Sequence, residues 1–389
     1  MFYRKRNTET SPFNQAMEKE YDLLIVGAGP IGCVVAEQAA KHKGWKSLII
    51  EKRDHIAGNC YDRVHESGVL VHQYGPHYFR SNKKELIDYL GQFTDWIPGN
   101  YEVKSYTNGE LYPFPINLLT LGQFFNRTFT AEEAEAYLNE IRIPNDNPQN
   151  SEEFVLSRVG KELYEAFYLN YTLKQWELHP TELNKSVCGR IPIRFNKDIR
   201  YVDHEYQLTP KEGFTAMFAR MIDNPLIDVQ LETSFEDVRG KIIPNIGTVY
   251  SGPIDAYFGY EYGKLPWRSL DIQFKEFDVD YKQPCVQINY PNDHDYTRSV
   301  EIKHVTGQKS DNTVISYEIP TWEGDPYYPV PADENAATFQ KYWKLAEQEN
   351  KNNSVYFSGR LARYTYINTD EAIEMALDTI REIIQDAEK

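Results

Sequence analysis

Three features are scarce or absent in this sequence, and each absence excludes a class of protein. Cysteine is scarce: the four that occur, Cys33, Cys60, Cys188 and Cys285, show no CxxC spacing, so we expect neither a disulfide framework nor a bound metal ion. No apolar run reaches about eighteen residues, the length that a membrane span needs. The polar residues 1–20 lack the apolar segment of a signal peptide. We therefore expect a cytoplasmic protein without membrane insertion, in which residues 1–20 form a loosely held extension.

The third feature is a shortage of positive charge relative to negative charge. The chain has 42 lysines and arginines against 58 aspartates and glutamates, which gives a formal net charge of −16. That balance argues against nucleic acid or an anionic membrane surface as the main partner, so a phosphorylated substrate would need a few local arginines. Aromatic residues are abundant, at 14% with 29 tyrosines, in a chain of 389 residues. This length predicts two or three domains.

The clearest motif runs from Tyr21 to Asn59. The apolar run Leu23–Val26 breaks into GAGPIG, a helical segment follows, and a second apolar run ends at Glu51. This pattern predicts a strand, a tight turn, a helix and a parallel strand, the unit that binds a dinucleotide. The glycine turn has no side chains to exclude a pyrophosphate, and the N-terminus of the helix after it favours an anion. The Glu51 carboxylate can accept hydrogen bonds from the hydroxyls of a ribose. The predicted contacts are Gly27, Gly29, Pro30, Ile31, Gly32 and Glu51.

The residues after Glu51 indicate which dinucleotide binds. The stretch KRDHIAGN resembles the second phosphate-contacting segment, ExxxxxGGN, of FAD proteins of the amine-oxidase type. Ala57 stands where a glycine is common, but Gly58 and Asn59 are present. We therefore predict FAD as the cofactor, with further contacts from Lys52, Gly58 and Asn59.

The rest of the chain contains signals for further elements. His77 lies in a YGPH turn and is a candidate to touch the flavin ring. Asn108-Gly109 predicts a hairpin over Val103–Phe114, and helical spacing from Leu118 to Trp176 includes a helix capped by Thr130. The irregular stretch 180–201 predicts a lid, and alternation from Val249 to Val305 predicts an antiparallel sheet.

These signals together predict an α/β fold: a Rossmann-like FAD-binding domain with an inserted helical domain and an antiparallel β-sheet domain. A strand at Val355–Phe357, followed by Gly359 and a helix at 370–386, would bring a second helix N-terminus to the cofactor. The predicted FAD-binding domain is discontinuous and comprises 21–82, 205–255 and 351–389. The helical domain covers 83–180 with a mobile lid to about 200, and the sheet domain covers 256–350.

Several blocks of sequence make the chain resemble the bacterial UDP-galactopyranose mutase family. The blocks are ELYEAFYLNYTLKQW at 162–176, GRIPIRFN at 189–196, GPIDAYFGYEYGKLPWRSL at 252–270, DYTR at 295–298, DPYYPV at 325–330 and SGRLARYTYIN at 358–368. The resemblance implies a flavoenzyme without net redox chemistry that interconverts the pyranose and furanose forms of a nucleotide sugar. In that family reduced FAD attacks the anomeric carbon through N5.

The resemblance also implies roles for single residues. Arg190, on the predicted lid, and Arg298 would hold the diphosphate, and Tyr201, Tyr328 and Tyr366 would donate phenolic hydrogen bonds to it. Tyr171 and Trp176 would form the platform for the uracil. Gly359, Arg360, Tyr366 and Asn368 would lie beside the flavin, and Arg268 would lie near the substrate. The predicted catalytic set is Arg190, Arg298, Arg360 and His77.

Two departures from the family pattern lie near the sugar. Asn368 stands where the family has an aspartate, and Arg80 stands where it has a histidine. Arg80 offers a fork of five donors, and Asn368 both donates and accepts. Together they favour a substrate whose periphery differs from galactose, such as UDP-N-acetylgalactosamine or a dTDP-6-deoxyhexose, alongside UDP-galactose itself.

Two other functions compete with the mutase. An FAD-dependent oxidase or desaturase of amine-oxidase-like fold would share the nucleotide motif and would consume a stoichiometric oxidant. A nucleotide-sugar binding protein without turnover would bind UDP and convert no sugar. For the mutase we expect a homodimer. Its small-molecule partner would be a nucleotide-sugar substrate, and we expect no binding of nucleic acid.

Overall fold

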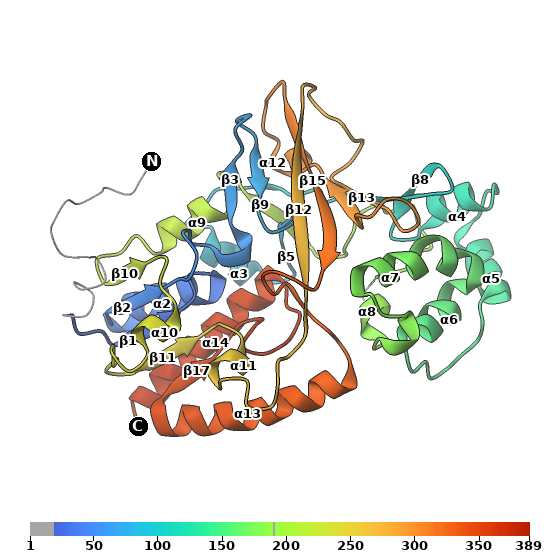
Figure 1. Ribbon diagram of the computed structural model, residues 1–389. Helices are drawn as coiled ribbons and strands as arrows, with labels where there is room; N and C mark the ends of the chain where they lie inside the picture. The colour runs from blue at the N-terminus through green and yellow to red at the C-terminus, as the bar shows by residue number, and fades with distance from the viewer. Residues whose placement is uncertain (1–18, 190) are drawn as a thin grey trace. The chain divides into compact units, whose positions relative to one another are not determined.

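A computed structural model gives the fold and describes residues 19–189 and 191–389 (Figure 1). The chain divides into two compact units. The first unit comprises the residues up to Tyr61 together with Phe214–Glu261 and Tyr342–Lys389. The second unit comprises Asp62–Gly213 and Tyr262–Lys341.

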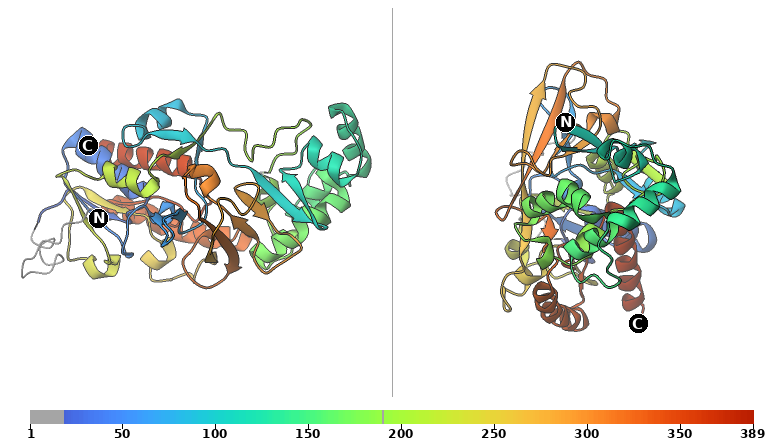
Figure 2. Two further views of the ribbon diagram at one scale, coloured as in Figure 1. Left: turned by 90° about the horizontal axis from the view of Figure 1, so that it is seen from above. Right: turned by 90° about the vertical axis from the view of Figure 1, so that its right-hand side faces the viewer.

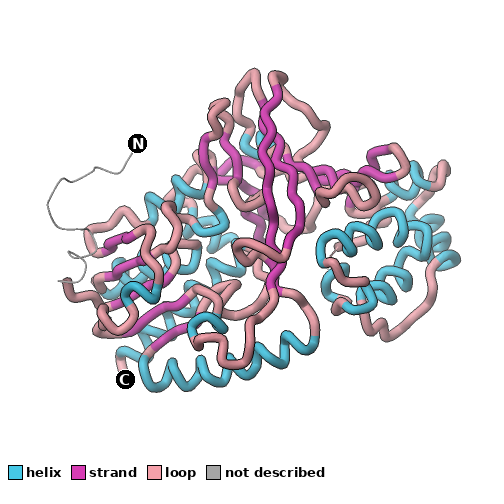
Figure 3. The backbone as a smooth tube through the Cα atoms, viewed as in Figure 1, coloured by secondary structure: helices cyan, strands magenta, loops and turns pink. Residues whose placement is uncertain are grey.

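The first unit is built on a five-stranded parallel sheet (Figure 3). Its strands, in spatial order, are β10 (Ile227–Gln230), β2 (Ser47–Ile50), β1 (Leu23–Val26), β11 (Gly247–Tyr250) and β17 (Val355–Phe357). The central strands are almost wholly buried because an all-parallel sheet is covered on both faces. Their continuous apolar sequences follow from that burial, and they confirm the predicted strand, turn, helix and strand.

Helices complete the first unit. The nucleotide-motif helix α2 (Pro30–Lys43) packs against α14 (Thr369–Ala387) and α9 (Phe214–Met221). Two short helices, α10 (Phe235–Val238) and α11 (Ile254–Tyr257), flank β11 in the sequence. The long helix α13 (Asp333–Asn353) contains the boundary between the two units.

The second unit contains a seven-stranded sheet. In spatial order its strands are β16 (Tyr328–Pro329), β12 (Trp267–Phe277), β15 (Thr313–Thr321), β14 (Arg298–Val300), β13 (Gln287–Asn289), β7 (Val103–Thr107) and β8 (Glu110–Phe114). All neighbours are antiparallel except β13 and β7, which are parallel. The hairpin predicted at Asn108-Gly109 is confirmed as the turn between β7 and β8.

Two small sheets and a group of helices complete this unit (Figure 2). The small sheets pair β3 (Asp62–Val64) with β4 (Leu70–His72), and β9 (Tyr206–Pro210) with both β5 (Phe79–Ser81) and β6 (Trp96–Pro98). The longer helices are α3 (Lys84–Leu90), α4 (Leu118–Phe124), α5 (Ala131–Ile141), α6 (Ser151–Tyr164) and α7 (Asn170–Trp176), with a π-helical turn, η2 (Glu165–Leu169), between the last two. The shorter ones are η3 (Pro180–Glu182), α8 (Ser186–Gly189) and α12 (Lys303–Thr306). The predicted cap is confirmed, because the Thr130 hydroxyl accepts the Glu133 N–H at 3.2 Å.

The bounds of the two units differ from the predicted domain bounds, and one predicted strand pairing differs as well. The predicted helical and sheet domains form one unit, because a single buried core contains Phe114 of the sheet and Leu138 and Phe167 of the helices. Residues 62–82 belong to the second unit because β5 pairs with β9. The antiparallel reading was wrong for the residues from Val249, since β11 lies between two parallel neighbours. In the part of the chain that the structure describes, none of the helices combines the length and apolar character needed to cross a membrane.

Candidate functional site

The turn after β1 leaves a stretch of backbone without side chains. Gly27 has φ +103°, and a Cβ there would lie 2.2 Å from the Ser251 Oγ. A Cβ on Gly32 would lie 2.0 Å from the Gly27 carbonyl oxygen, and one on Gly58 would lie 2.9 Å from the Gly29 Cα. Because the strand–turn–helix and the second glycine segment meet backbone to backbone, the N–H groups at the start of α2 remain accessible to a phosphate.

Glu51 braces this turn from the end of β2. Its Oε2 accepts the Ala28 N–H at 3.0 Å and its Oε1 accepts the Arg53 N–H at 3.0 Å, while the residue is 7% exposed. Each carboxylate oxygen has a second lone pair that can accept a ribose hydroxyl. The Arg53 Nη1 donates to the Asn59 Oδ1 at 3.1 Å, which holds the glycine segment beside the carboxylate.

Ala57 keeps the backbone conformation that a glycine would have there. Its φ is +73°, in the left-handed region, and its N–H donates to the Ala28 carbonyl oxygen at 2.8 Å. Alanine in that region is strained by roughly 1–2 kcal/mol relative to a right-handed conformation. The segment before Gly58 therefore has the glycine-type geometry although the glycine itself is missing.

The C-terminal part of the cradle follows β17. Gly359 has φ +105°, and a Cβ there would lie 3.1 Å from the Ile31 Cγ1. The Arg360 Nη2 donates to the Ile367 carbonyl oxygen at 2.6 Å, and its guanidinium carbon lies 4.8 Å from the centroid of the Tyr366 ring. These contacts fix the guanidinium and the phenol in one arrangement.

Asn368 stands at the N-cap of α14 and contacts Glu371. The Asn368 backbone N–H donates to the Glu371 Oε2 at 2.7 Å, and the Asn368 Nδ2 donates to the same oxygen at 3.0 Å. An aspartate at position 368 would place two carboxylates in that contact. The amide therefore has a local reason within this chain, apart from any contact with a ligand.

In the second unit, Arg298 is held by a buried acid and a phenol. Its Nε donates to the Glu318 Oε2 at 2.5 Å, and its Nη2 donates to the Tyr328 hydroxyl at 3.0 Å. The Glu318 side chain is fully buried and that of Arg298 is 19% exposed. Burial alone would lower the pKa of Arg298, but the attraction of Glu318 raises it well above its ordinary value. The guanidinium is therefore a permanent cation.

Tyrosines surround this pair. Burial raises the pKa of Tyr171 to about 12 against the opposing effect of Arg298, so its phenol stays protonated at neutral pH. The Tyr201 ring lies 6.2 Å from the Tyr101 ring, and Tyr101 stacks on Tyr78 at 4.5 Å. The cluster thus combines one fixed cation with several protonated phenols, a set suited to an anion that also carries a flat ring.

Trp176 and Arg268 lie at the other end of α7. Trp176 is buried and packs edge-on against Tyr328 at 6.4 Å. Arg268 is fully buried, and it donates from Nε to the Gln175 carbonyl oxygen at 2.8 Å and from Nη2 to the Lys174 carbonyl oxygen at 3.4 Å. A cation at the carbonyl end of a helix stabilises it. The structure therefore gives Arg268 a capping role, and its predicted contact with substrate stays a prediction.

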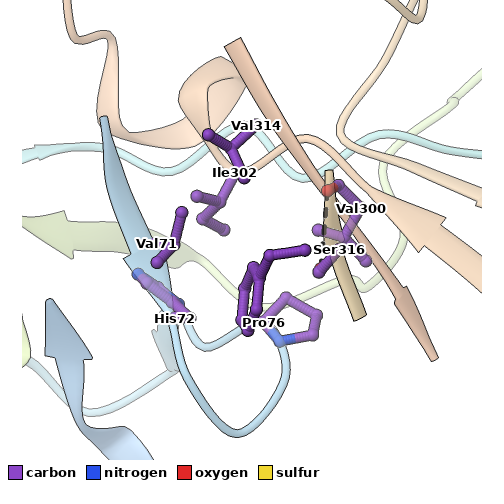
Figure 4. Close-up of a pocket in the computed structure, with 8 residues that line it drawn as sticks. Val71, His72, Pro76, Val300, Ile302, Val314 and Ser316 are labelled. Carbon is purple, nitrogen blue, oxygen red and sulfur yellow. Dashed lines mark hydrogen bonds between the residues drawn. The ribbon is translucent and has the colours of Figure 1, made fainter. Parts of the chain in front are cut away.

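The YGPH turn is ordered by a second histidine. The His77 N–H donates to the His72 Nδ1 at 2.9 Å, and the His77 Nδ1 lies 2.9 Å from the Gly75 carbonyl oxygen. His72 borders a small, mainly aliphatic cavity whose other labelled residues include Val71, Val300, Ile302 and Val314 (Figure 4). Burial lowers the pKa of His72 to about 4, so it is neutral and accepts through Nδ1.

Arg80 follows this turn on β5. Its Nη1 donates to the Tyr78 hydroxyl at 3.1 Å, which connects it to the stacked pair of Tyr78 and Tyr101. The Arg80 guanidinium carbon also lies 5.5 Å from the centroid of the Tyr78 ring, so the guanidinium is held against this aromatic pair. Its predicted role in sugar selection stays a prediction.

The predicted site residues divide between the two units. The first unit contains the candidate cofactor contacts Gly27, Gly29, Pro30, Ile31, Gly32, Glu51, Lys52, Gly58, Asn59, Gly359, Arg360, Tyr366 and Asn368. The second contains His77, Arg80, Tyr171, Trp176, Tyr201, Arg268, Arg298 and Tyr328. Arg190 lies outside the described residues. Within the predicted lid, Arg194 is buried and bonded to Asp203 at 2.6 Å, and the predicted motion stays a prediction.

Sequence reasoning missed Glu318, Tyr101 and Lys174. Glu318 had a usable signal, because an acid and an arginine on neighbouring antiparallel strands form a cross-strand pair when the register aligns them, as it does here. Lys174 had none, since its partners are backbone carbonyls more than a hundred residues away.

Comparisons with known proteins indicate the family and the fold of the chain. Residues 166–366 match the model of the UDP-galactopyranose mutase family, and residues 25–93 match that of the NAD(P)-binding Rossmann-like domain. The chain is 38% identical to a probable UDP-galactopyranose mutase of Klebsiella pneumoniae, over 93% of this chain and 94% of that one. It is 33% identical to the dTDP-fucopyranose mutase of Escherichia coli, over 92% and 96%. A crystal structure of reduced UDP-galactopyranose mutase shares the fold, with a TM-score of 0.73 and 14% identity over 94% and 96%.

Proposed function

The chain belongs to the UDP-galactopyranose mutase family, and on that premise we propose that it interconverts the pyranose and furanose forms of a nucleotide sugar with reduced FAD bound. The two relatives named above are named for different sugars and different bases. We therefore propose the class of substrate, which is a nucleoside diphosphate sugar. The candidate substrates are UDP-galactose, UDP-N-acetylgalactosamine and a dTDP-6-deoxyhexose.

The observation that carries the proposal is the way Arg298 is held. Glu318 engages its Nε and Nη2 edge, and Tyr328 engages Nη2 as well. Among the described residues, none accepts a hydrogen bond from Nη1, and the side chain is partly exposed. An arginine fixed along one edge by a buried acid presents its remaining donors in one direction, which suits a diphosphate that must leave and return.

The other residues of this cluster support the same ligand. Tyr328 and Tyr201 carry phenols that can donate to phosphate oxygens, and Tyr171 offers a ring on which a base can stack. We propose that Arg190 adds a second cation from the lid. These contacts bind and orient the diphosphate, and they stabilise the charge that develops on it.

The glycine cradle of the first unit fits a dinucleotide, and we propose that this is FAD. Gly29 and Gly58 admit the pyrophosphate, Glu51 accepts the ribose hydroxyls, and Arg360 with Tyr366 contacts the ring system. We assign Lys52, Asn59, Gly359 and Asn368 to the edge of the same site. We propose that His77, in the YGPH turn, contacts the flavin. When bound and reduced, FAD supplies the nucleophile for the anomeric carbon.

The test is turnover of anaerobically reduced enzyme on the three candidate sugars, with separation of pyranose and furanose products. We expect one of them to be isomerised and no oxidant to be consumed. Consumption of one oxidant per product would indicate the oxidase. Binding of UDP or dTDP without conversion of any sugar would indicate a binding protein and overturn the proposal. The homodimer remains a prediction that light scattering can check.

A further inference from the structure

Lys174, near the end of α7, points its ammonium at a loop in the second unit. This loop, residues 290–297, joins β13 to β14, and Figure 1 shows it in orange beside the helices drawn in green. The Lys174 Nζ donates to the Tyr290 carbonyl oxygen and lies 3.0 Å from that of Asp293, 3.2 Å from that of His294 and 3.3 Å from that of Tyr296. An ammonium has three donors, so these four carbonyl oxygens share them and the loop backbone is held around the Nζ atom.

The same loop has a second attachment through Asn292. The Asn292 Nδ2 donates to the Thr107 Oγ1 at 2.7 Å and to the Ala166 carbonyl oxygen at 3.0 Å, and its Oδ1 accepts from the Asn170 Nδ2 at 2.8 Å. These bonds tie only the first half of the loop. The second half of the loop contacts α7 through the His294 and Tyr296 carbonyl oxygens, which face the Lys174 Nζ.

Residues of the candidate diphosphate site lie at both ends of this arrangement. Arg298 follows the loop after one residue, Thr297, whose N–H donates to the Glu318 carbonyl oxygen at 2.9 Å. Tyr171 lies one helical turn before Lys174 on α7, and Arg268 bonds the Lys174 carbonyl oxygen at the end of that helix. The Tyr290 N–H also donates to the Thr297 carbonyl oxygen at 2.8 Å, and β14 pairs with both β13 and β15, so the sheet fixes Arg298. The bonds from Lys174 to the loop therefore set the position of α7, and with it that of Tyr171, relative to Arg298.

We propose that Lys174 is a positioning residue for the nucleotide sugar: its ammonium holds α7 against loop 290–297 and so sets Tyr171 relative to Arg298. The inference rests on the proposed function, because it assigns the cluster to nucleotide binding. It adds a residue that touches neither the diphosphate nor the base.

Titration of the ammonium gives the proposal a signature. Burial lowers the pKa of Lys174 to about 8, against the opposing effects of Asp293 and Asp295 on the loop. Tyr290, His294 and Tyr296 of the loop face the ammonium with their carbonyl oxygens. Arg268 of β12 donates to the Lys174 backbone carbonyl oxygen and to the Glu177 Oε1, so this ion pair lies at the end of α7. As pH rises through 8 the amine loses one donor and its charge, α7 is released from the loop, and nucleotide affinity falls.

Rising pH should affect stability in the opposite direction to nucleotide affinity. Because the pKa in the folded chain lies below the ordinary value of 10.5, the unfolded chain binds more protons between pH 8 and 10.5. The contribution of Lys174 to the free energy of unfolding therefore rises over this window. If nucleotide affinity falls with rising pH while the free energy of unfolding does not, the loss of affinity comes from the loop and not from general unfolding.

The experiment measures Kd for UDP, with dTDP as a second probe, on wild type, Lys174→Met and Lys174→Ala at pH 7 and 9. Lys161→Met is the matched control, since Lys161 is an exposed lysine of the same unit, paired with Glu165 at 3.6 Å on the helix surface. We expect Lys174→Met to weaken binding about tenfold at pH 7, as for one charge-assisted contact, and to lose pH dependence. Wild type and Lys161→Met should both weaken about tenfold between pH 7 and 9. Ethylammonium, at constant ionic strength, should restore affinity to Lys174→Ala, whereas tetramethylammonium should not.

Each outcome decides a separate claim. If wild type binds neither UDP nor dTDP, the proposed function fails. If wild type binds and its Kd is the same at pH 7 and 9, the Lys174 proposal is wrong, whether or not the variants fold. If Lys174→Met binds as wild type does, or if tetramethylammonium rescues Lys174→Ala equally well, the ammonium does not position α7 against the loop.

Discussion

The pair of Arg298 and Glu318 allows binding and stability to be separated by a double substitution. In Arg298→Ala the fully buried Glu318 carboxylate loses its counter-ion. In the double variant Arg298→Ala, Glu318→Gln, neither buried charge remains. The two variants lack the same guanidinium, so they share any defect in diphosphate binding and differ in stability.

The expected magnitudes follow from burial. Breaking a buried ion pair costs about 3–5 kcal/mol, which corresponds to a fall in melting temperature of roughly 10 °C for a unit of this size. The double variant should regain most of that loss, because removing both charges is often close to neutral. The lost contact with the diphosphate is worth about 3 kcal/mol, so kcat/KM should fall at least about a hundredfold in both variants.

Two assays decide the matter. Thermal unfolding is followed for wild type, both single variants and the double variant, and kcat/KM is measured on the sugar that wild type isomerises best. Recovery of stability without recovery of kcat/KM supports the assignment. If the double variant returns to within about tenfold of the wild-type kcat/KM, Arg298 serves only as the counter-ion of Glu318 and the diphosphate assignment is refuted.

Four further predictions concern the cradle and the sugar. Gly29→Val should fold but lose FAD, as judged by flavin absorbance, because its Cβ meets protein only at 3.6 Å and its branches fill the space for the pyrophosphate. Ala57→Gly should raise the free energy of unfolding by about 1 kcal/mol in denaturant titration, through relief of the strained φ. Asn368→Asp should lower it by about 0.5 kcal/mol at pH 7, an effect absent in a Glu371→Gln background. Arg80→His should shift the ratio of kcat/KM values toward UDP-galactose by about tenfold across the sugar panel.

Each of these has an outcome that counts against it. If soluble Gly29→Val still binds one FAD per chain, the pyrophosphate of FAD does not lie against Gly29. No gain for Ala57→Gly would mean that the left-handed backbone is not strained. An equal loss for Asn368→Asp with and without Glu371 would point to another neighbour, and an unchanged sugar ratio would show that Arg80 does not select the sugar.

The parts of the fold that sequence could predict are those specified locally. The turn at 27–32, the hairpin at Asn108-Gly109 and the cap at Thr130 each depend on residues within a few positions of one another. The parallel pairing of β13 with β7 could not be read in this way, because its strands are far apart in sequence and no local pattern gives their register. The same limit explains why the helical and sheet segments were predicted as separate domains.

The site shows the same division. The glycines could be named because the chemistry demands their type, and Arg298 could be named through the resemblance of the DYTR block to the family. The groups that hold them in place could not, because Glu318 contributes through strand register and Lys174 through backbone carbonyls brought near by a loop. Ala57 lies between these cases: sequence located the missing glycine, and the structure shows that the backbone is left-handed all the same.

Isomerisation without net electron transfer can be tested through the number of product molecules formed per electron supplied. Enzyme is reduced anaerobically with a known amount of reductant, excess reductant is removed, and the best substrate of the panel is added in large excess. We expect many furanose molecules per reduced flavin, a flavin that stays reduced, and no turnover by the oxidised enzyme. One product per flavin with reoxidation of the flavin, or equal rates for the oxidised and reduced enzymes, would contradict it.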